Sequence, residues 1–93
     1  PSQFFLSQNV PNPFHSECLI RFGLAKRARV SLKIYDVTGT LVQTLVNEVL
    51  KPGYYSKTWA GRDTNGRRVG SGIYFYRLTT GDFMSAKKIT LLK

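Results

Sequence analysis

The side chains in this sequence that could act in catalysis or bind a metal are few and dispersed. His15 is the only histidine and Cys18 the only cysteine. Without a second histidine or a nearby pair of aspartates, His15 completes neither a catalytic triad nor a zinc site. A single cysteine cannot form an internal disulfide, and its neighbours Leu19 and Ile20 predict a buried and inert thiol. We therefore expect His15 to be structural or solvent-facing.

Two other patterns resemble sites but lack essential parts. Asp63-Thr64-Asn65-Gly66 begins like a calcium loop, but the later acidic ligands are missing, so an Asx-type turn is the better interpretation. No GxGxxG follows a strand and precedes a helix, which excludes a phosphate loop. The five Asp and Glu residues are scattered along the chain, which disfavours paired acid–base catalysis. We expect no enzyme activity, no metal and no cofactor.

The charge balance is strongly basic. Fourteen Lys and Arg against five Asp and Glu give a formal net charge of +9. The basic residues form three groups: Lys26, Arg27 and Arg29; Arg62, Arg67 and Arg68; Lys87, Lys88 and Lys93. The first two groups fall in turn-like segments and favour a solvated basic surface. An anionic partner, such as lipopolysaccharide or another surface glycan, is the alternative, because such a charge steers anions over long range.

Aromatic residues raise the question of nucleic-acid or carbohydrate binding. Basic and aromatic residues interleave in residues 72–79, but the chain has no RNA-recognition signature and no reading helix, so no nucleic-acid partner is expected. Tyr54, Tyr55 and Phe75 could form an exposed strip that binds carbohydrate, although a role in the core is favoured. Trp59 is predicted to be a core residue, as a lone tryptophan in an alternating strand usually is.

The elements that would position these residues are strands. Apolar residues recur with a period of two, whereas no helical period is sustained. Strands are expected at residues 3–8, 18–24, 29–36, 40–49, 54–59, 72–79 and 83–92. About seven short antiparallel strands predict an all-β sandwich of the Ig-like or fibronectin-III-like kind.

The alternation also predicts the core and its irregularities. The residues expected between the sheets are Ile20, Phe22, Val30, Leu32, Ile34, Trp59, Tyr74 and Tyr76. Residues 41–46 break the alternation, which predicts a bulge or a bend. Residues 36–39 should form a turn in which Gly39 takes a positive φ. Ile73 and Phe75 lie on the second face of their strand, which predicts a central strand with a covered outer face.

The length and the start of the chain bear on its origin. Ninety-three residues form one domain, and no apolar run reaches the ~18 residues needed to span a membrane. The chain opens at Pro1 without an initiator Met or a signal-peptide pattern. We therefore expect residues 1–93 to be a single Ig-like domain excised from a longer secreted parent, with a parent domain upstream.

Several short sequence motifs, taken in their order along the chain, carry a family resemblance. They are PNPF at 11–14, IRFGL at 20–24, VSLKIYDVTGTLV at 30–42, PGYYSKTWAGRDTNGRRVGSGIYFYRL at 52–78 and KKITLLK at 87–93. Together they resemble the type A C-terminal sorting domains of type IX secretion cargo. The resemblance is to the variety that is itself similar to the Ig-like domain of the flagellar hook-capping protein FlgD. It covers essentially the whole chain.

The resemblance implies a sandwich at the C-terminus of a secreted bacterial protein that travels through the periplasm. The outer-membrane secretion machinery would recognise it and deliver the protein to the cell surface or the medium. The recognition residues implied are Pro11, Asn12, Pro13, Gly72, Tyr74, Lys87 and Lys88. One departure is the sequence His15-Ser16-Glu17, where Asn-Pro-Thr often follows PNPF. The alternatives left open are a structural or adhesive Ig-like spacer, including one that binds carbohydrate, and a hook-capping structural role.

Overall fold

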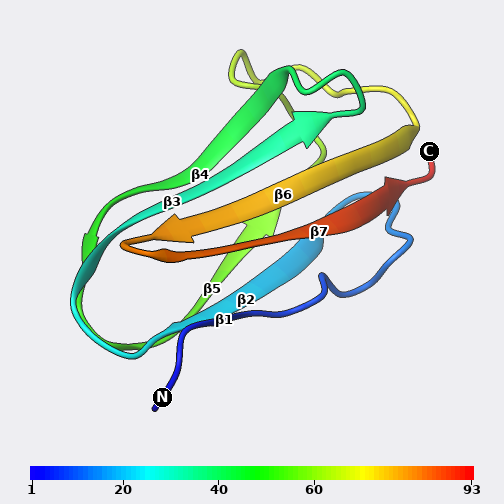
Figure 1. The fold of residues 1–93 in the computed structure, drawn as a ribbon. Coiled ribbons are helices and arrows are strands. Elements are labelled where there is room, and N and C mark those ends of the chain that lie inside the picture. The colour runs from blue at the N-terminus through cyan, green and yellow to red at the C-terminus, as the bar shows by residue number, and fades with distance from the viewer.

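Seven strands form two antiparallel sheets that pack face to face (Figure 1). The computed structural model describes residues 1–93. The strands are β1 (Phe5–Leu6), β2 (Cys18–Leu24), β3 (Ala28–Asp36), β4 (Leu41–Leu50), β5 (Gly53–Trp59), β6 (Gly72–Thr80) and β7 (Phe83–Leu91). One sheet has the order β1-β2-β5 and the other the order β4-β3-β6-β7. The predicted Ig-like sandwich of seven strands is confirmed.

The predicted strand bounds agree closely with the structure except in the first strand. Residues 3–8 were expected to form a strand, but β1 contains only Phe5 and Leu6. Beyond β1 the chain stays beside β2 but pairs with it only intermittently. Ser7 N donates to Arg21 O at 2.9 Å, and Val10 exchanges two backbone hydrogen bonds with Leu19. Between them the side-chain amide of Gln8 donates to Lys88 O in the other sheet at 2.8 Å. The prediction of a longer strand was wrong because the backbone ladder with β2 is interrupted between Ser7 and Val10.

The core lies between the sheets and contains all eight residues predicted for it. Trp59 is 1% exposed, which confirms its role in the core. Its ring lies 5.5 Å from that of Phe14 and 5.3 Å from that of Tyr74. The Cys18 thiol is buried as expected, and burial raises its pKa to about 11.

Local irregularities follow the sequence signals. The pairing of β3 with β4 shifts register twice, which confirms the bulge predicted in residues 41–46. Gly39 closes its turn with a φ of 84°. The Asp63 carboxylate accepts hydrogen bonds from the backbone N–H groups of Asn65 and Arg67, at 2.9 and 3.0 Å. These bonds confirm the Asx-type turn, because the carboxylate is used to close the loop.

The outer face of β6 differs from expectation. β6 is central in its sheet, between β3 and β7. Its outward residues are nevertheless open, with Ile73 41% and Phe75 39% exposed. The prediction of a covered outer face was wrong because a central position pairs the backbone edges of a strand, whereas only one face of each sheet meets the other sheet.

Candidate recognition site at the C-terminal strand

One end of the sandwich gathers three segments that are far apart in the sequence. They are a corner formed by residues 9–15, the start of β6, and the end of β7 beside the C-terminus (Figure 1). Of the predicted recognition residues, Pro11, Asn12 and Pro13 lie on the corner. Gly72 and Tyr74 lie at the start of β6. The structure therefore brings five of the seven predicted residues to the same end.

Hydrogen bonds attach the corner to the outer edge of β7. Phe14 N donates to Thr90 O at 3.0 Å, and Leu92 N donates to Phe14 O at 2.9 Å. The side chain of Asn12 adds a third bond, accepting from Thr90 N at 2.9 Å. An unpaired strand edge offers backbone groups to any other chain. The corner satisfies those groups over the last residues of β7.

Buried side chains also anchor the corner to the core of the sandwich. Asn9 is 2% exposed, and its side-chain amide donates to Pro11 O at 2.9 Å. The Phe14 side chain is fully buried against Trp59. The peptide bonds before Pro11 and Pro13 are both cis. Sequence reasoning missed the structural roles of Asn9 and Phe14. Phe14 gave a usable signal as the single large apolar residue in residues 11–17, whereas nothing in the local pattern marked Asn9.

The outer side of the corner is held by polar contacts near the C-terminus. His15 is exposed as expected, and its Nδ1 lies 2.7 Å from Leu92 O. The Arg68 guanidinium donates to His15 O at 3.1 Å, and Lys93 N donates to Ser71 Oγ at 2.9 Å. The departure from the usual sequence after PNPF therefore leaves a formed corner, with His15 contributing one of its bonds.

Gly72 and Tyr74 stabilise the corner end of the sandwich through backbone conformation and side-chain packing. Gly72 has a φ of 152°, a conformation that favours glycine, and no atom lies within 4 Å of where its Cβ would stand. Tyr74 is 8% exposed, its ring meets Trp59 edge-on, and its hydroxyl donates to Gly70 O at 2.6 Å. Burial raises the Tyr74 pKa, with a smaller contribution from the negative charge of Asp36. Gly72 thus shapes the backbone, and Tyr74 packs against Trp59, which in turn contacts Phe14 of the corner.

The two predicted lysines point to opposite faces of β7 because they are consecutive in a strand. Lys87 is half-buried and in phase with the buried Ile89 and Leu91. Lys88 is exposed and lies opposite Phe75 in the register of β6 and β7. The structure therefore places only the Lys88 ammonium group on the outer face of the four-stranded sheet.

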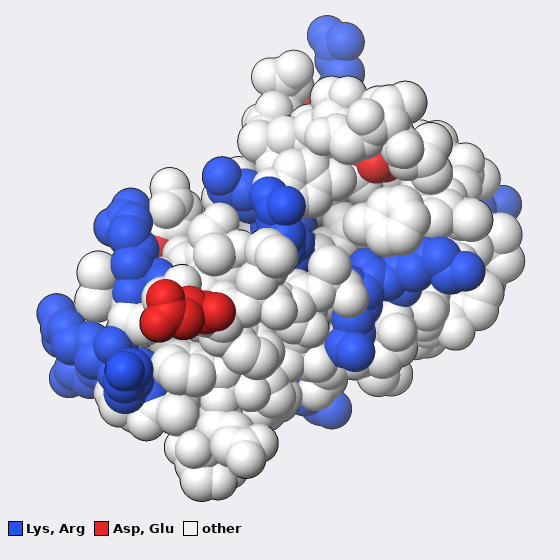
Figure 2. All heavy atoms as spheres, in the orientation of Figure 1, with Lys and Arg blue, Asp and Glu red and all other residues white.

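That outer face combines basic and aromatic side chains. The Arg77 guanidinium lies 4.9 Å from the centre of the Tyr35 ring and donates to the Tyr35 hydroxyl at 2.8 Å. Beside this pair is an open hollow of about 390 Å³ that also touches Phe75. Figure 2 shows Lys and Arg side chains separated by uncharged surface on this face. The arrangement is a mixed surface on which positive charge accompanies exposed apolar area.

The exposed aromatic strip, considered as an alternative to a role in the core, does not form. Tyr54 is 75% exposed on the three-stranded sheet, whereas Phe75 lies on the outer face of the other sheet. Tyr55 is half-buried and stacks on Phe22 at 5.4 Å. The favoured role in the core is confirmed for Tyr55, which packs against the core, but is wrong for Tyr54 and Phe75, which are exposed. The three residues share no surface because adjacent strand residues face opposite ways, and β5 and β6 belong to different sheets.

Two further structural findings concern metals and membranes. The chain contains no group of three or more His, Cys, Asp and Glu side chains that could hold a metal ion. None of its segments forms a helix of the length and apolarity needed to cross a membrane.

Comparison with known families places the chain. Residues 14–82 match the FlgD Ig-like domain family. The chain belongs to this family. The matched range begins at Phe14 and ends at Asp82, just before β7. Most of the corner and the whole of β7, which pair with each other, therefore lie outside the matched part of this FlgD-type Ig-like domain.

Solved structures are similar to this chain over nearly its whole length. Dimeric latent PorU from Porphyromonas gingivalis is 21% identical, with a TM-score of 0.75 over 97% of this chain. PorZ from the same organism, described as an essential bacterial surface component of the type-IX secretion system, is 22% identical with a TM-score of 0.61 over 99% of this chain. The FlgD-type domain spans only 9% and 12% of those chains. No curated protein matches this chain. The structural likeness shows a shared fold that includes the corner and β7.

Proposed function

We propose that this FlgD-type Ig-like domain is a non-catalytic sorting domain of type A. It would direct a secreted bacterial protein through the periplasm and the type IX secretion system to the cell surface or the medium. The observation that carries the proposal is the hydrogen-bonded attachment of the corner to β7 through Asn12, Phe14 and Thr90. This feature lies largely outside the FlgD match but within the range similar to PorU and PorZ.

The proposed partner is the protein machinery of the outer membrane. Pro11, Asn12 and Pro13 are exposed on the corner and available for contact. Gly72 and Tyr74 would act indirectly by supporting the corner, and Lys87 and Lys88 would add charge along β7. Gln8 and the corner hydrogen-bond to the edge of β7 from Lys88 onward. β1 and Phe4 lie beside the earlier part of β7, so a partner strand would add there by displacing the N-terminal segment. Such a partner would recognise the folded corner end of the sandwich rather than an unfolded peptide.

Export of a fusion protein tests the proposal. Residues 1–93, fused to a reporter targeted to the periplasm, should carry it to the surface of a host with type IX secretion. Lys88→Ala should reduce export while changing stability by less than ~0.5 kcal/mol, because the side chain is exposed. Lys57→Ala is the matched control, since Lys57 is exposed on the other sheet. Surface exposure of the reporter and thermal melting are the measurements.

The outcomes separate the site from the function. Normal export of Lys88→Ala with an unchanged melting curve would remove Lys88 from the recognition site. Retention of the intact fusion in the periplasm would reject the sorting role. It would leave the second candidate, a structural or adhesive Ig-like spacer. The FlgD match itself favours that candidate, because it covers residues 14–82 and omits β7.

A further inference from the structure

The outer face of the four-stranded sheet places two positive charges side by side. Lys33 on β3 and Arg77 on β6 are directly opposite each other in the antiparallel register. Both side chains point outward, because the residues on either side of them in each strand are buried. Like charges directly opposite on neighbouring strands destabilise a sheet. The pair therefore costs stability in the unbound domain, and a bound anion would relieve that cost.

No acidic side chain in the sheet compensates the pair. Lys88 on β7 adds a third positive charge to the same face, and β6 and β7 contain no Asp or Glu. Glu48 of β4 lies opposite Val30, whose side chain faces inward. Asp36, at the end of β3, borders the hollow beside Arg77, but its carboxylate accepts hydrogen bonds from Thr38 in its own turn. The outer face therefore presents positive charge that the domain itself leaves unpaired.

The Arg77 guanidinium is held in place and keeps donors for a ligand. It lies 4.9 Å from the centre of the Tyr35 ring, and one of its N–H groups donates to the Tyr35 hydroxyl at 2.8 Å. A guanidinium has five N–H donors, and two of them can bind one carboxylate in parallel. The Tyr35 hydroxyl accepts from Arg77 and so keeps its own proton to donate. The two side chains together form a fixed binding pair for a carboxylate.

An apolar hollow adjoins the Arg77 guanidinium. It has a volume of about 390 Å³, and its lining includes Phe75, Val37 and Ala86 as well as Arg77 and Tyr35. Phe75 is 39% and Val37 68% exposed. Exposed apolar area beside polar groups marks surfaces that bind a partner. Because the surface is hollowed here, it suits a side chain that projects from a protein better than the flat surface of a membrane.

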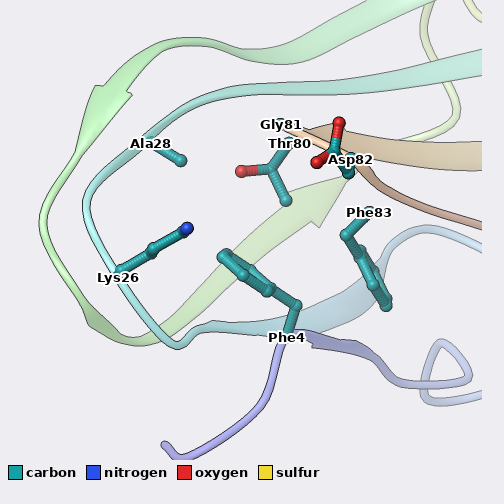
Figure 3. Close-up of a pocket in the computed structure, with 7 residues that line it drawn as sticks. All are labelled: Phe4, Lys26, Ala28, Thr80, Gly81, Asp82 and Phe83. Carbon is teal, nitrogen blue, oxygen red and sulfur yellow. The ribbon is translucent and has the colours of Figure 1, made fainter.

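The hollow at the opposite end of the sandwich, of about 370 Å³, has a different character (Figure 3). Lys26 and Asp82 are both exposed there, so charges of both signs are available. The Phe4 and Phe83 rings stack on each other with their centres 5.8 Å apart. The Thr80 hydroxyl has no hydrogen-bond partner, but it is buried out of the reach of a ligand. This second hollow therefore selects no class of ligand, unlike the basic pair on the sheet face.

We propose that the outer face of the four-stranded sheet binds an acidic segment of a partner protein. One carboxylate would bind Arg77 and Tyr35, and a neighbouring apolar side chain would enter the hollow beside Phe75. Lys33 and Lys88 would flank the segment and attract further carboxylates. A second copy of this domain is disfavoured as the partner, because each copy carries a formal net charge of +9. The inference goes beyond the sorting function, since it concerns a ligand that the purified domain should bind without export.

Titration of the ¹⁵N-labelled domain with an acidic peptide, followed by NMR, tests the binding. The probe is a short peptide, blocked at both ends, in which Glu and Leu alternate. It should cause saturable shifts confined to the outer face of β3, β6 and β7, with a dissociation constant below about 1 mM at low ionic strength. The same peptide with Ala in place of Leu should bind about fivefold more weakly, because it leaves the hollow unfilled.

Three results of the titration would overturn the proposal. The first is the absence of saturable shifts. The second is equal binding of the Ala peptide, because charge alone would then explain the affinity. The third is binding to vesicles of phosphatidylglycerol without binding to the peptide, because the face would then recognise a lipid surface.

A pair of arginine variants separates the site from the overall charge. Arg77→Gln should weaken binding of the Glu-Leu peptide about tenfold, since it removes a charged double hydrogen bond. Arg21→Gln is the matched control, because Arg21 is exposed on the three-stranded sheet and its loss changes the net charge equally. Equal weakening by the two variants would overturn the proposal.

Lys33→Gln separates binding from folding. It removes one of the two opposed charges, so it should raise the Tm by about 1–5 °C. It should also weaken binding of the Glu-Leu peptide about twofold or more. A lowered Tm or an unchanged affinity would overturn the proposal. None of these measurements uses export of the fusion, so this inference and the sorting function can fail separately.

Discussion

Individual residues at the corner end act mainly through packing around Trp59. Phe14 from the corner and Tyr74 from β6 contact the indole ring, and Trp59 Nε1 donates to Arg62 O at 3.0 Å. The three aromatic rings come from segments separated by tens of residues. Trp59 is therefore the residue through which the corner, β5 and β6 stabilise one another.

Removal of the indole should be costly. Trp59→Ala is expected to lower the free energy of unfolding by ~3–5 kcal/mol, since it leaves a large cavity and removes the hydrogen bond from Trp59 Nε1 to Arg62 O. That is a large share of the ~5–15 kcal/mol typical of a domain. Urea denaturation followed by circular dichroism is the measurement. Tyr54→Ala, at a side chain 75% exposed, is the control and should change stability by under ~0.5 kcal/mol. Equal effects of the two variants would contradict the packing account.

The start of β6 depends on the conformation of one glycine. Gly72 has a φ of 152°, whereas Gly70, two residues earlier, has no such φ and open space around its Cβ position. Gly72→Ala should therefore cost ~1–3 kcal/mol through backbone strain, although no atom would clash with the new methyl group. Gly70→Ala is the control and should be close to neutral. Thermal melting of both variants is the measurement. A neutral Gly72→Ala would show that the strand start adapts to the side chain.

Among the elements, the pairing of corner and β7 differs from the pairing of consecutive strands. Hairpins such as β6–β7 join neighbours in the sequence, whereas the corner reaches β7 across more than 70 residues, as the bond from Thr90 N to Asn12 Oδ1 shows. Both chain ends are tied to one edge by this contact. A receptor that contacts the corner would therefore sense whether the whole domain is folded.

The pH dependence of stability belongs to the molecule as a whole. Burial raises the pKa of Cys18 from 9.0 to about 11 and that of Tyr76 from 10.0 to about 12. Both groups stay protonated longer in the folded state, so their contribution is complete below about pH 9 and is lost as pH rises toward 12. The hydrogen bond from Thr38 lowers the pKa of Asp36 below 3.8, so that contribution is present above about pH 4 and is lost in acid.

The Tm should therefore be highest between about pH 4 and 9 and fall on both sides. Circular dichroism melts across pH 3–12 are the measurement. Tyr76→Phe removes one titrating group and should flatten the decline above about pH 10, although it also loses the bond from the Tyr76 hydroxyl to Ser7 O. Tyr54→Phe, at an exposed position, should leave the profile unchanged. A profile of Tyr76→Phe with the same alkaline decline as the natural domain would refute this assignment.

Local sequence signals sufficed for much of this fold. Period-two alternation predicts which side chains of β2, β3 and β6 face inward, because the alternation of side chains in a strand is a local property. The turns closed by Asp36 and Asp63 are equally local, since each carboxylate binds backbone groups within four residues. The family resemblance carried by the short motifs implied recognition residues in the corner, at the start of β6 and in β7.

Only the tertiary structure decided how those features meet. Whether the outer face of β6 is covered, and whether Tyr54 and Phe75 share a surface, depends on which sheet each strand joins. The attachment of Asn12 to β7 and the unpaired Thr80 hydroxyl are long-range facts of the same kind. Such contacts are set by the packing of distant segments, and no local pattern of residue types specifies which hydrogen bonds will form across a sandwich or which group will be left without one.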